Sequence, residues 1–150
     1  MAGTQQKQWR SMPADWLLKI NLACSLYMTG LIWFVQIVHY PLFERIGTEN
    51  FVLYEERHQK LTTRVVAPAM LLELVASIAV VLLTAKPSSA LWIASSITLL
   101  VWVSTMAIQV PMHSQLASGF NSATWKNLVV SNWIRTIAWT IRSILLVWVI

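Results

Sequence analysis

Three histidines are the residues of this chain best suited to chemistry, and they fall at matching places in its hydropathy pattern. His39 lies at the end of the first apolar segment, His58 just before the second, and His113 just after the third. If these segments are helices that run up and down, all three side chains lie at one end of a bundle. Histidine is costly in lipid and useful as a ligand or proton carrier, so this clustering predicts a site.

The elements that must position the histidines are four apolar segments, each near the roughly 20 residues that a helix needs to cross a bilayer. They cover residues 17–38, 65–83, 91–110 and 128–150. Charged residues make up only 11% of the chain, against about a quarter in soluble domains. Because helices satisfy the backbone in lipid, we predict an all-α, integral membrane, up-and-down four-helix bundle that forms a single domain over residues 1–150.

The connections between the segments differ in length at the two ends of this bundle. A tight polar turn, Lys86–Ser89, joins the second and third segments. The connections at the histidine end, residues 40–64 and 111–127, are long, and function usually collects where loops are long. Pro41 and Pro111 disfavour continuation of the first and third helices. The Gly47-Thr48 pair, followed by an acidic residue, predicts that the second helix begins near Glu49.

Two charged residues fall near the middle of apolar segments. Glu73 and Arg142 lie roughly 15 and 12 Å from the same end of the bundle, at about 1.5 Å per residue. An unpaired charge at that depth is costly, and such residues face the bundle interior and pair. We therefore predict a Glu73–Arg142 ion pair. It either only pins two helices together or also handles a proton or an anionic group of a ligand.

Polar residues on all four predicted helices point toward the histidine end. On the last segment they recur at steps of three and four, which keeps them on one face. This pattern predicts a polar cavity that can hold water and that opens toward the long connections. Trp33, Trp102 and Trp139 lie deep enough to serve in packing or as a wall for a ligand. The predicted ligand-binding residues are Gln36, Glu73, Gln109, Asn132, Arg135, Trp139 and Arg142.

Three kinds of chemistry, and one interpretation without chemistry, are compatible with His39, His58 and His113. These histidines are both the predicted catalytic residues and the candidate metal ligands. With Glu55 or Glu56 they form a possible metal site, because imidazole and carboxylate suit zinc, iron or copper. The other interpretations are haem ligation, general acid–base chemistry on an apolar substrate, and interfacial histidines without chemistry. The sequence requires no cofactor.

Three stretches of the chain resemble a known family. They are GLIWFVQIVHYPLF at the end of the first segment, IQVPMHSQLASGF after the third, and NWIRTIAWTIRSILLVW in the fourth. Proline with a polar residue at a segment end, followed by tryptophan and arginine at helical spacing, resembles the anthrone-oxygenase-like family of small four-helix membrane proteins. The resemblance implies a four-helix fold and, for some members, cofactor-independent oxidation of polycyclic phenolic substrates.

Two functions from different classes follow from these observations. The first is binding, with or without oxidation, of a small apolar phenolic or quinone-like molecule, either cofactor-independent or metal-assisted. The second is a non-catalytic accessory subunit of a larger membrane complex. The expected partners are the lipid bilayer and a small apolar ligand. The sequence is also compatible with a homo-oligomer or a larger membrane complex. We expect no nucleic acid, because the basic residues behind the net charge of +5 are scattered at segment ends. The expected location is a bacterial inner membrane.

Overall fold

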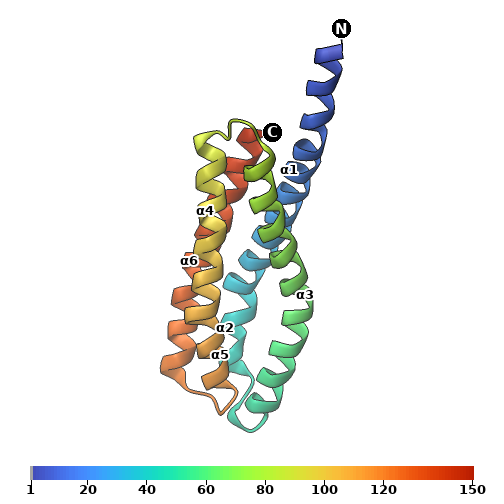
Figure 1. Cartoon of the computed structure of the whole chain (residues 1–150). Helices are drawn as coiled ribbons and strands as arrows, with labels where there is room; N and C mark the ends of the chain where they lie inside the picture. Colours follow the sequence, from blue (N-terminus) through green and yellow to red (C-terminus); the bar gives the residue numbers. More distant parts are fainter. Residues whose placement is uncertain (1) are drawn as a thin grey trace.

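The structure is a computed structural model that describes the backbone of residues 2–150 and the side chains of residues 14–150. Those residues form helices and connections, without a β-strand. Four helical rods alternate in direction along the chain (Figure 1). Their elements are α1 (Ala2–Phe34), η1 (Val35–His39), α2 (Tyr40–Leu42), η2 (Phe43–Arg45), α3 (Thr48–Leu83), α4 (Ser89–Ser104), η3 (Thr105–Gln109), α5 (Val110–Leu116) and α6 (Ser122–Val149). The all-α class predicted from the sequence is therefore confirmed.

Three stretches of helix are long and apolar enough to cross a membrane. These are Ala14–Arg45, Thr48–Leu83 and Ser89–Leu116. Within the described residues α6 does not reach the same threshold of hydropathy, so the predicted fourth span stands apart from the other three. The physical reason is that α6 carries two arginines and several other polar residues, and both arginines, Asn132, Thr136 and Ser143 are buried inside the bundle.

The two prolines do not end their helices, which corrects the expectation from Pro41 and Pro111. At each site the backbone widens into one turn of π-helix before the proline, and the helix then continues. The Tyr40 N–H donates to the Val35 carbonyl, and the Val110 N–H donates to the Thr105 carbonyl, five residues back in both cases. Proline lacks a donor and clashes with the preceding turn, and a π-bulge is one way to accommodate both effects.

Consequently the two long connections are mostly helical. The first is occupied by α2, η2 and the start of α3, which begins at Thr48, in agreement with the predicted start near Glu49. The second contains α5, and only residues 117–121 separate α5 from α6. The turn at residues 84–88 lies at the opposite end of the bundle (Figure 1). There the Ser88 side chain caps α4 by accepting a hydrogen bond of 3.2 Å from the Leu91 N–H.

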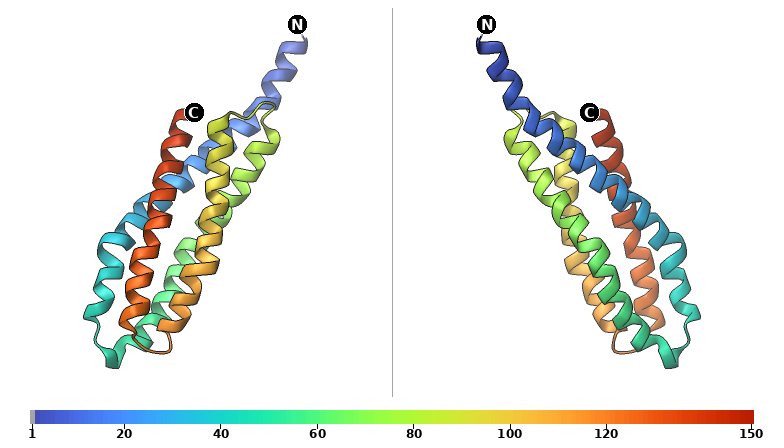
Figure 2. Two further views of the ribbon diagram at one scale, coloured as in Figure 1. Left: turned by 90° about the vertical axis from the view of Figure 1, so that its left-hand side faces the viewer. Right: turned by 90° about the vertical axis from the view of Figure 1, so that its right-hand side faces the viewer.

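Helix α6 packs against both α1 and α4, and α3 packs against α1 (Figure 2). Three clusters of buried side chains divide the core along the bundle axis. One cluster, at the histidine end, contains Tyr40, Phe43, Phe51, Leu116, Trp125 and Leu128. The middle cluster contains Met28, Ile32, Met70, Val101, Ala138 and Trp139, and the cluster at the turn end contains Val80, Leu91, Ala94 and Leu146. The histidine end is thus held by aromatic packing.

Gly47 at the start of α3 provides a first test of the fold. It has φ of +78° and ψ of 144°, a conformation that L side chains rarely adopt. Gly47→Ala is expected to lower the free energy of unfolding by about 1–3 kcal/mol. Gly30→Ala, in α1 and also free of neighbours within 4 Å, is the matched control. It is expected to raise stability by about 0.5–1 kcal/mol. Chemical denaturation in detergent measures both; equal effects would contradict the prediction.

Candidate functional site

The three histidines lie together at one end of the bundle, as predicted. His39 Nε2 is 2.9 Å from His58 Nδ1, and the ring centroids of His58 and His113 are 5.3 Å apart. They come from η1, α3 and α5, so the clustering depends on the up-and-down arrangement. His39 also packs edge-on against Phe43, with centroids 5.3 Å apart. Aromatic packing therefore restricts the orientations of the imidazole rings.

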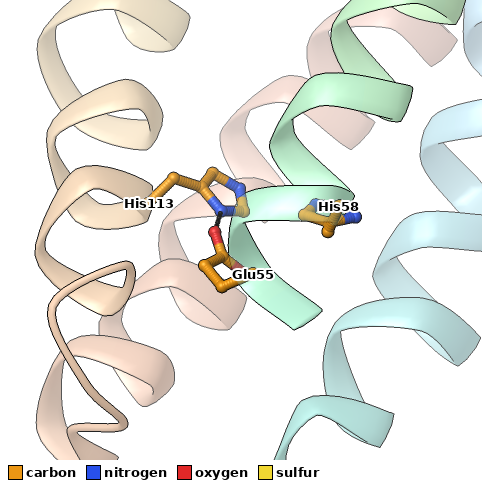
Figure 3. A group of neighbouring side chains, drawn as sticks. All are labelled: Glu55, His58 and His113. Atoms are coloured by element: carbon orange, nitrogen blue, oxygen red, sulfur yellow. Dashed lines mark hydrogen bonds and ion pairs between the residues drawn. The ribbon is translucent and has the colours of Figure 1, made fainter. Parts of the chain in front are cut away.

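A buried carboxylate completes this cluster. Glu55 is fully buried, and its Oε1 lies 2.6 Å from His113 Nδ1 (Figure 3). The other ring nitrogen of His113, Nε2, lies 2.9 Å from the Tyr40 hydroxyl. Of the two acidic residues that the sequence offered, Glu55 thus belongs to the site, whereas Glu56 is exposed. The result is a chain of contacts from Glu55 through His113 to Tyr40.

Sequence reasoning missed Tyr40 and Gln59. The Gln59 amide donates to Glu55 Oε1 at 3.2 Å and to the His113 backbone carbonyl at 2.9 Å. It lies one helical turn beyond Glu55, a spacing at which side chains on one helix meet. Tyr40 directly follows His39, and the π-turn of η1 shifts its register on the helix. Of these two residues, only Gln59 had a usable signal in the sequence, namely its spacing from Glu55.

Beside the cluster is a cavity of about 320 Å³. Its walls are mostly apolar, with Met28, Ile32, Met70 and Trp102 among them. The polar lining residues that matter for chemistry are Tyr40, His58, Gln109, His113 and Arg135. The predicted polar cavity is therefore corrected to an apolar cavity with a polar inner wall, because most of the polar groups inside the bundle bond to one another instead.

The cavity opens through the side of the bundle. Its exposed lining residues are Thr63 and Leu71 of α3, Met106 of η3 and Val110 of α5. Since all four belong either to α3 or to the η3–α5 rod, the mouth lies between those elements. The sequence instead predicted an opening toward the long connections. At that end the bundle is closed by the buried cluster that contains Tyr40, Phe43 and Phe51.

Arg135 is the cation of the cavity wall, and its hydrogen-bonding capacity is incompletely used. It is 6% exposed, and its Nη1 donates to Asn132 Oδ1 over a long 3.4 Å. Its Nε has no partner within the described part of the chain. The guanidinium lies 5.2 Å from the centroid of the Trp139 ring, within cation–π range. A buried guanidinium in this state has capacity for a further acceptor.

The predicted Glu73–Arg142 pair is confirmed. Arg142 Nη1 donates to Glu73 Oε1 at 2.7 Å, and both side chains are buried. Arg142 also donates to Asn21, Ser77 and Thr98. The Trp139 indole donates to Glu73 Oε2 at 3.0 Å. These residues are absent from the cavity lining among residues 14–150, and Trp102 stands in the wall where Trp139 was predicted.

The remaining predicted ligand-binding residues divide between network and cavity. Asn132 donates to Gln36 Oε1 at 2.9 Å, and Gln36 donates to the Val129 carbonyl at 3.1 Å. That pair ties α6 to η1. Gln109 lines the cavity and accepts from Ser104 at 3.0 Å. Of the predicted ligand-binding residues, therefore, only Gln109 and Arg135 line the cavity. Among the histidines, His58 and His113 line it, whereas His39 forms a hydrogen bond with His58.

Comparisons of this chain with protein-family models, with curated proteins and with solved structures find no match. The resemblance to the anthrone-oxygenase-like family therefore stays a prediction. Function has to be argued from the site itself, namely from a lateral apolar cavity whose inner wall carries an arginine, a tyrosine and two histidines.

Proposed function

We propose that the chain is a multi-pass integral membrane protein, in the inner membrane of a bacterium, and that all four rods span the bilayer. The outward face of α6 supports this, because from Val130 onward its exposed residues are all apolar. They are Val130, Trp133, Ile134, Ile137, Ile141, Ile144, Val147 and Trp148. Its arginines point inward and are buried. A helix with this distribution suits lipid better than its mean hydropathy indicates.

We propose further that the protein binds a small apolar molecule with oxygen substituents, of the phenol or quinone class. The observation that carries this proposal is the cavity of about 320 Å³. Apolar walls with a few convergent polar groups are typical of small-molecule sites, which start at roughly 300 Å³. The mouth between α3 and the η3–α5 rod would face the acyl chains, so an apolar ligand would enter from the bilayer.

Unused polar atoms support a ligand in this place. Two buried atoms without a hydrogen-bond partner in the described chain belong to lining residues, Trp102 Nε1 and Arg135 Nε. Leaving such atoms unpaired costs about 1–3 kcal/mol each. An oxygen-bearing ligand would supply an acceptor for Arg135, and His113 with Tyr40 would exchange a proton with it. If the resemblance to anthrone oxygenases extends to activity, the bound molecule would also be oxidised.

The alternative, an accessory subunit without a ligand, is expected to satisfy its own charges and to fill its own interior. The Glu73–Arg142 network meets that expectation, since the guanidinium has four acceptors. Arg135 and the cavity beside it do not. The difference between the two arginines therefore favours ligand binding over the accessory role.

Filling the cavity tests this proposal. Ala67 lines the cavity from α3, and Ala67→Phe would place a ring in it. Ala23→Phe on exposed α1 surface is the matched control. With 1,4-naphthoquinone titrated calorimetrically into protein in lipid nanodiscs, Ala67→Phe is expected to weaken binding by about tenfold or more, a loss of about 1.4 kcal/mol. Equal affinities of Ala67→Phe, Ala23→Phe and the unchanged chain would overturn the proposal.

A further inference from the structure

At the inner end of the cavity, three side chains bring typical metal ligands together. Glu55, His58 and His113 each offer one ligand atom, and these atoms lie within 4.8 Å of one another. Figure 3 shows Glu55 and His58 on one stretch of α3, with His113 reaching them from α5. The Glu-x-x-His spacing presents both α3 ligands on one face of the helix. Helix-bundle metal sites are built from such pairs on facing helices.

We propose that Glu55, His58 and His113 bind one divalent transition-metal ion. Two imidazoles and one carboxylate are the ligand set that holds non-haem iron with open coordination positions, and the same atoms suit manganese, cobalt or zinc. Each ligand atom would lie about 2.0–2.2 Å from the ion. The contact of 2.6 Å between Glu55 Oε1 and His113 Nδ1 would widen as both atoms turn to the ion.

The burial of Glu55 is the second observation that points to a cation. The side chain is 0% exposed, and its Oε2 has no partner among residues 14–150. Its ion-pair partner in the described chain is His113, which is charged only when protonated. A buried carboxylate is costly unless it is paired or coordinates a metal. A divalent ion would neutralise the carboxylate and supply the permanent cation that this side chain lacks.

The surroundings of each ligand are those that metal sites use to orient their side chains. His58 Nδ1 is bonded to His39 at 2.9 Å and to the Thr62 hydroxyl at 3.1 Å. That arrangement directs His58 Nε2 to the ion. His113 Nε2 is held by the Tyr40 hydroxyl at 2.9 Å, which leaves Nδ1 for the ion. Metal-ligating histidines typically engage their other ring nitrogen in this way, and carboxylate ligands typically accept hydrogen bonds as well. Here Gln59 donates such a bond to Glu55.

Three protein ligands leave coordination positions open. Because His58 and His113 both line the cavity, those positions would face its interior. An oxygen of the cavity ligand, or water, would complete the coordination sphere. This last step rests on the proposed function, whereas binding of the ion by the three side chains does not.

The test is metal binding by the full chain in detergent, purified without a histidine tag and stripped with a chelator. Co²⁺ serves as the probe because its visible absorption reports imidazole and carboxylate ligation. We expect one Co²⁺ per chain by elemental analysis, with an absorption spectrum of bound Co²⁺. Glu55→Gln, His58→Asn and His113→Ala are each expected to weaken binding roughly 100-fold or more, and His39→Phe about 10–100-fold, as for other outer partners of metal ligands.

Glu56→Gln is the matched control, since Glu56 adjoins Glu55 on α3 and is exposed. It is expected to keep full Co²⁺ affinity. Circular dichroism identifies any variant that fails to fold, and His58→Asn then decides, because it leaves the Glu55–His113 contact intact. Co²⁺ far below one per chain in the unchanged protein, or equal affinity in folded Glu55→Gln and Glu56→Gln, would overturn the metal site. If Co²⁺ binding fails this test while naphthoquinone still binds, only the metal site is overturned and the proposed function stands. If Co²⁺ binds as expected while naphthoquinone does not bind, the metal site stands and the proposed function fails.

Discussion

Glu73→Gln is expected to lower the free energy of unfolding by about 3–5 kcal/mol, the usual cost of removing one partner of a buried ion pair. Glu73 accepts from both Arg142 and Trp139, and its two oxygens are used in different bonds. The amide that replaces the carboxylate retains one acceptor and carries no charge. Arg142 would then remain as a buried cation without a counter-ion. Unfolding in bicelles, followed by tryptophan fluorescence, measures the change.

The double change Glu73→Leu with Arg142→Met separates charge from packing. Replacing both partners of a buried pair by apolar residues is often close to neutral. Here only part of the loss is expected to return, because Asn21 and the Trp139 indole each lose a partner, whereas Thr98 and Ser77 keep others. A double variant as unstable as Glu73→Gln would show that the pair acts through geometry rather than through its charges.

The Glu73–Arg142 pair was predictable because one physical cost dominates at its depth. A lone charge in lipid is so unfavourable that a matching charge at the same depth of another helix is the expected partner. The clustering of His39, His58 and His113 followed from topology in the same way, since four alternating helices return three segment ends to one side. Neither prediction needed the details of side-chain packing.

The features that the sequence did not predict depend on local backbone geometry. Pro41 and Pro111 were expected to interrupt their helices, but one π-turn before each proline lets the helix continue. That continuation brings Tyr40 to His113 and closes the histidine end with aromatic packing. The cavity consequently opens through the side of the bundle. A hydropathy pattern does not contain the information that distinguishes an ending helix from a widened one.

The two buried arginines of α6 illustrate the limit of sequence reasoning about sites. Arg135 and Arg142 lie two turns apart on one face, and both were predicted to bind a ligand. The structure gives Arg142 four acceptors and gives Arg135 one long hydrogen bond. Spacing places residues on a face, but the number of acceptors around each one depends on the neighbouring helices. The ligand-binding role that we propose therefore belongs to Arg135.

Arg135→Met is expected to separate stability from binding, in contrast to changes at Arg142. Methionine removes a buried charge without a counter-ion in the described chain and fills similar space. It loses one weak hydrogen bond to Asn132 and a cation–π contact with Trp139, which is worth about 0.5–2 kcal/mol. Relief from burying the charge offsets these losses, because replacing buried charged groups by apolar ones is often neutral or stabilising. Stability should therefore change by no more than about 1 kcal/mol.

Binding should respond differently to the same change. A hydrogen bond from a charged donor contributes about 1.5–3 kcal/mol, so Arg135→Met is expected to weaken naphthoquinone binding by about 10–150-fold. Arg135→Lys keeps the charge but loses the planar fork of donors, and an intermediate affinity is expected. Calorimetric titration in nanodiscs, with unfolding measured on the same samples, checks both effects. If Arg135→Met lost stability as Glu73→Gln does while binding naphthoquinone normally, Arg135 would be a structural residue, and the acceptor that it lacks would not be the ligand.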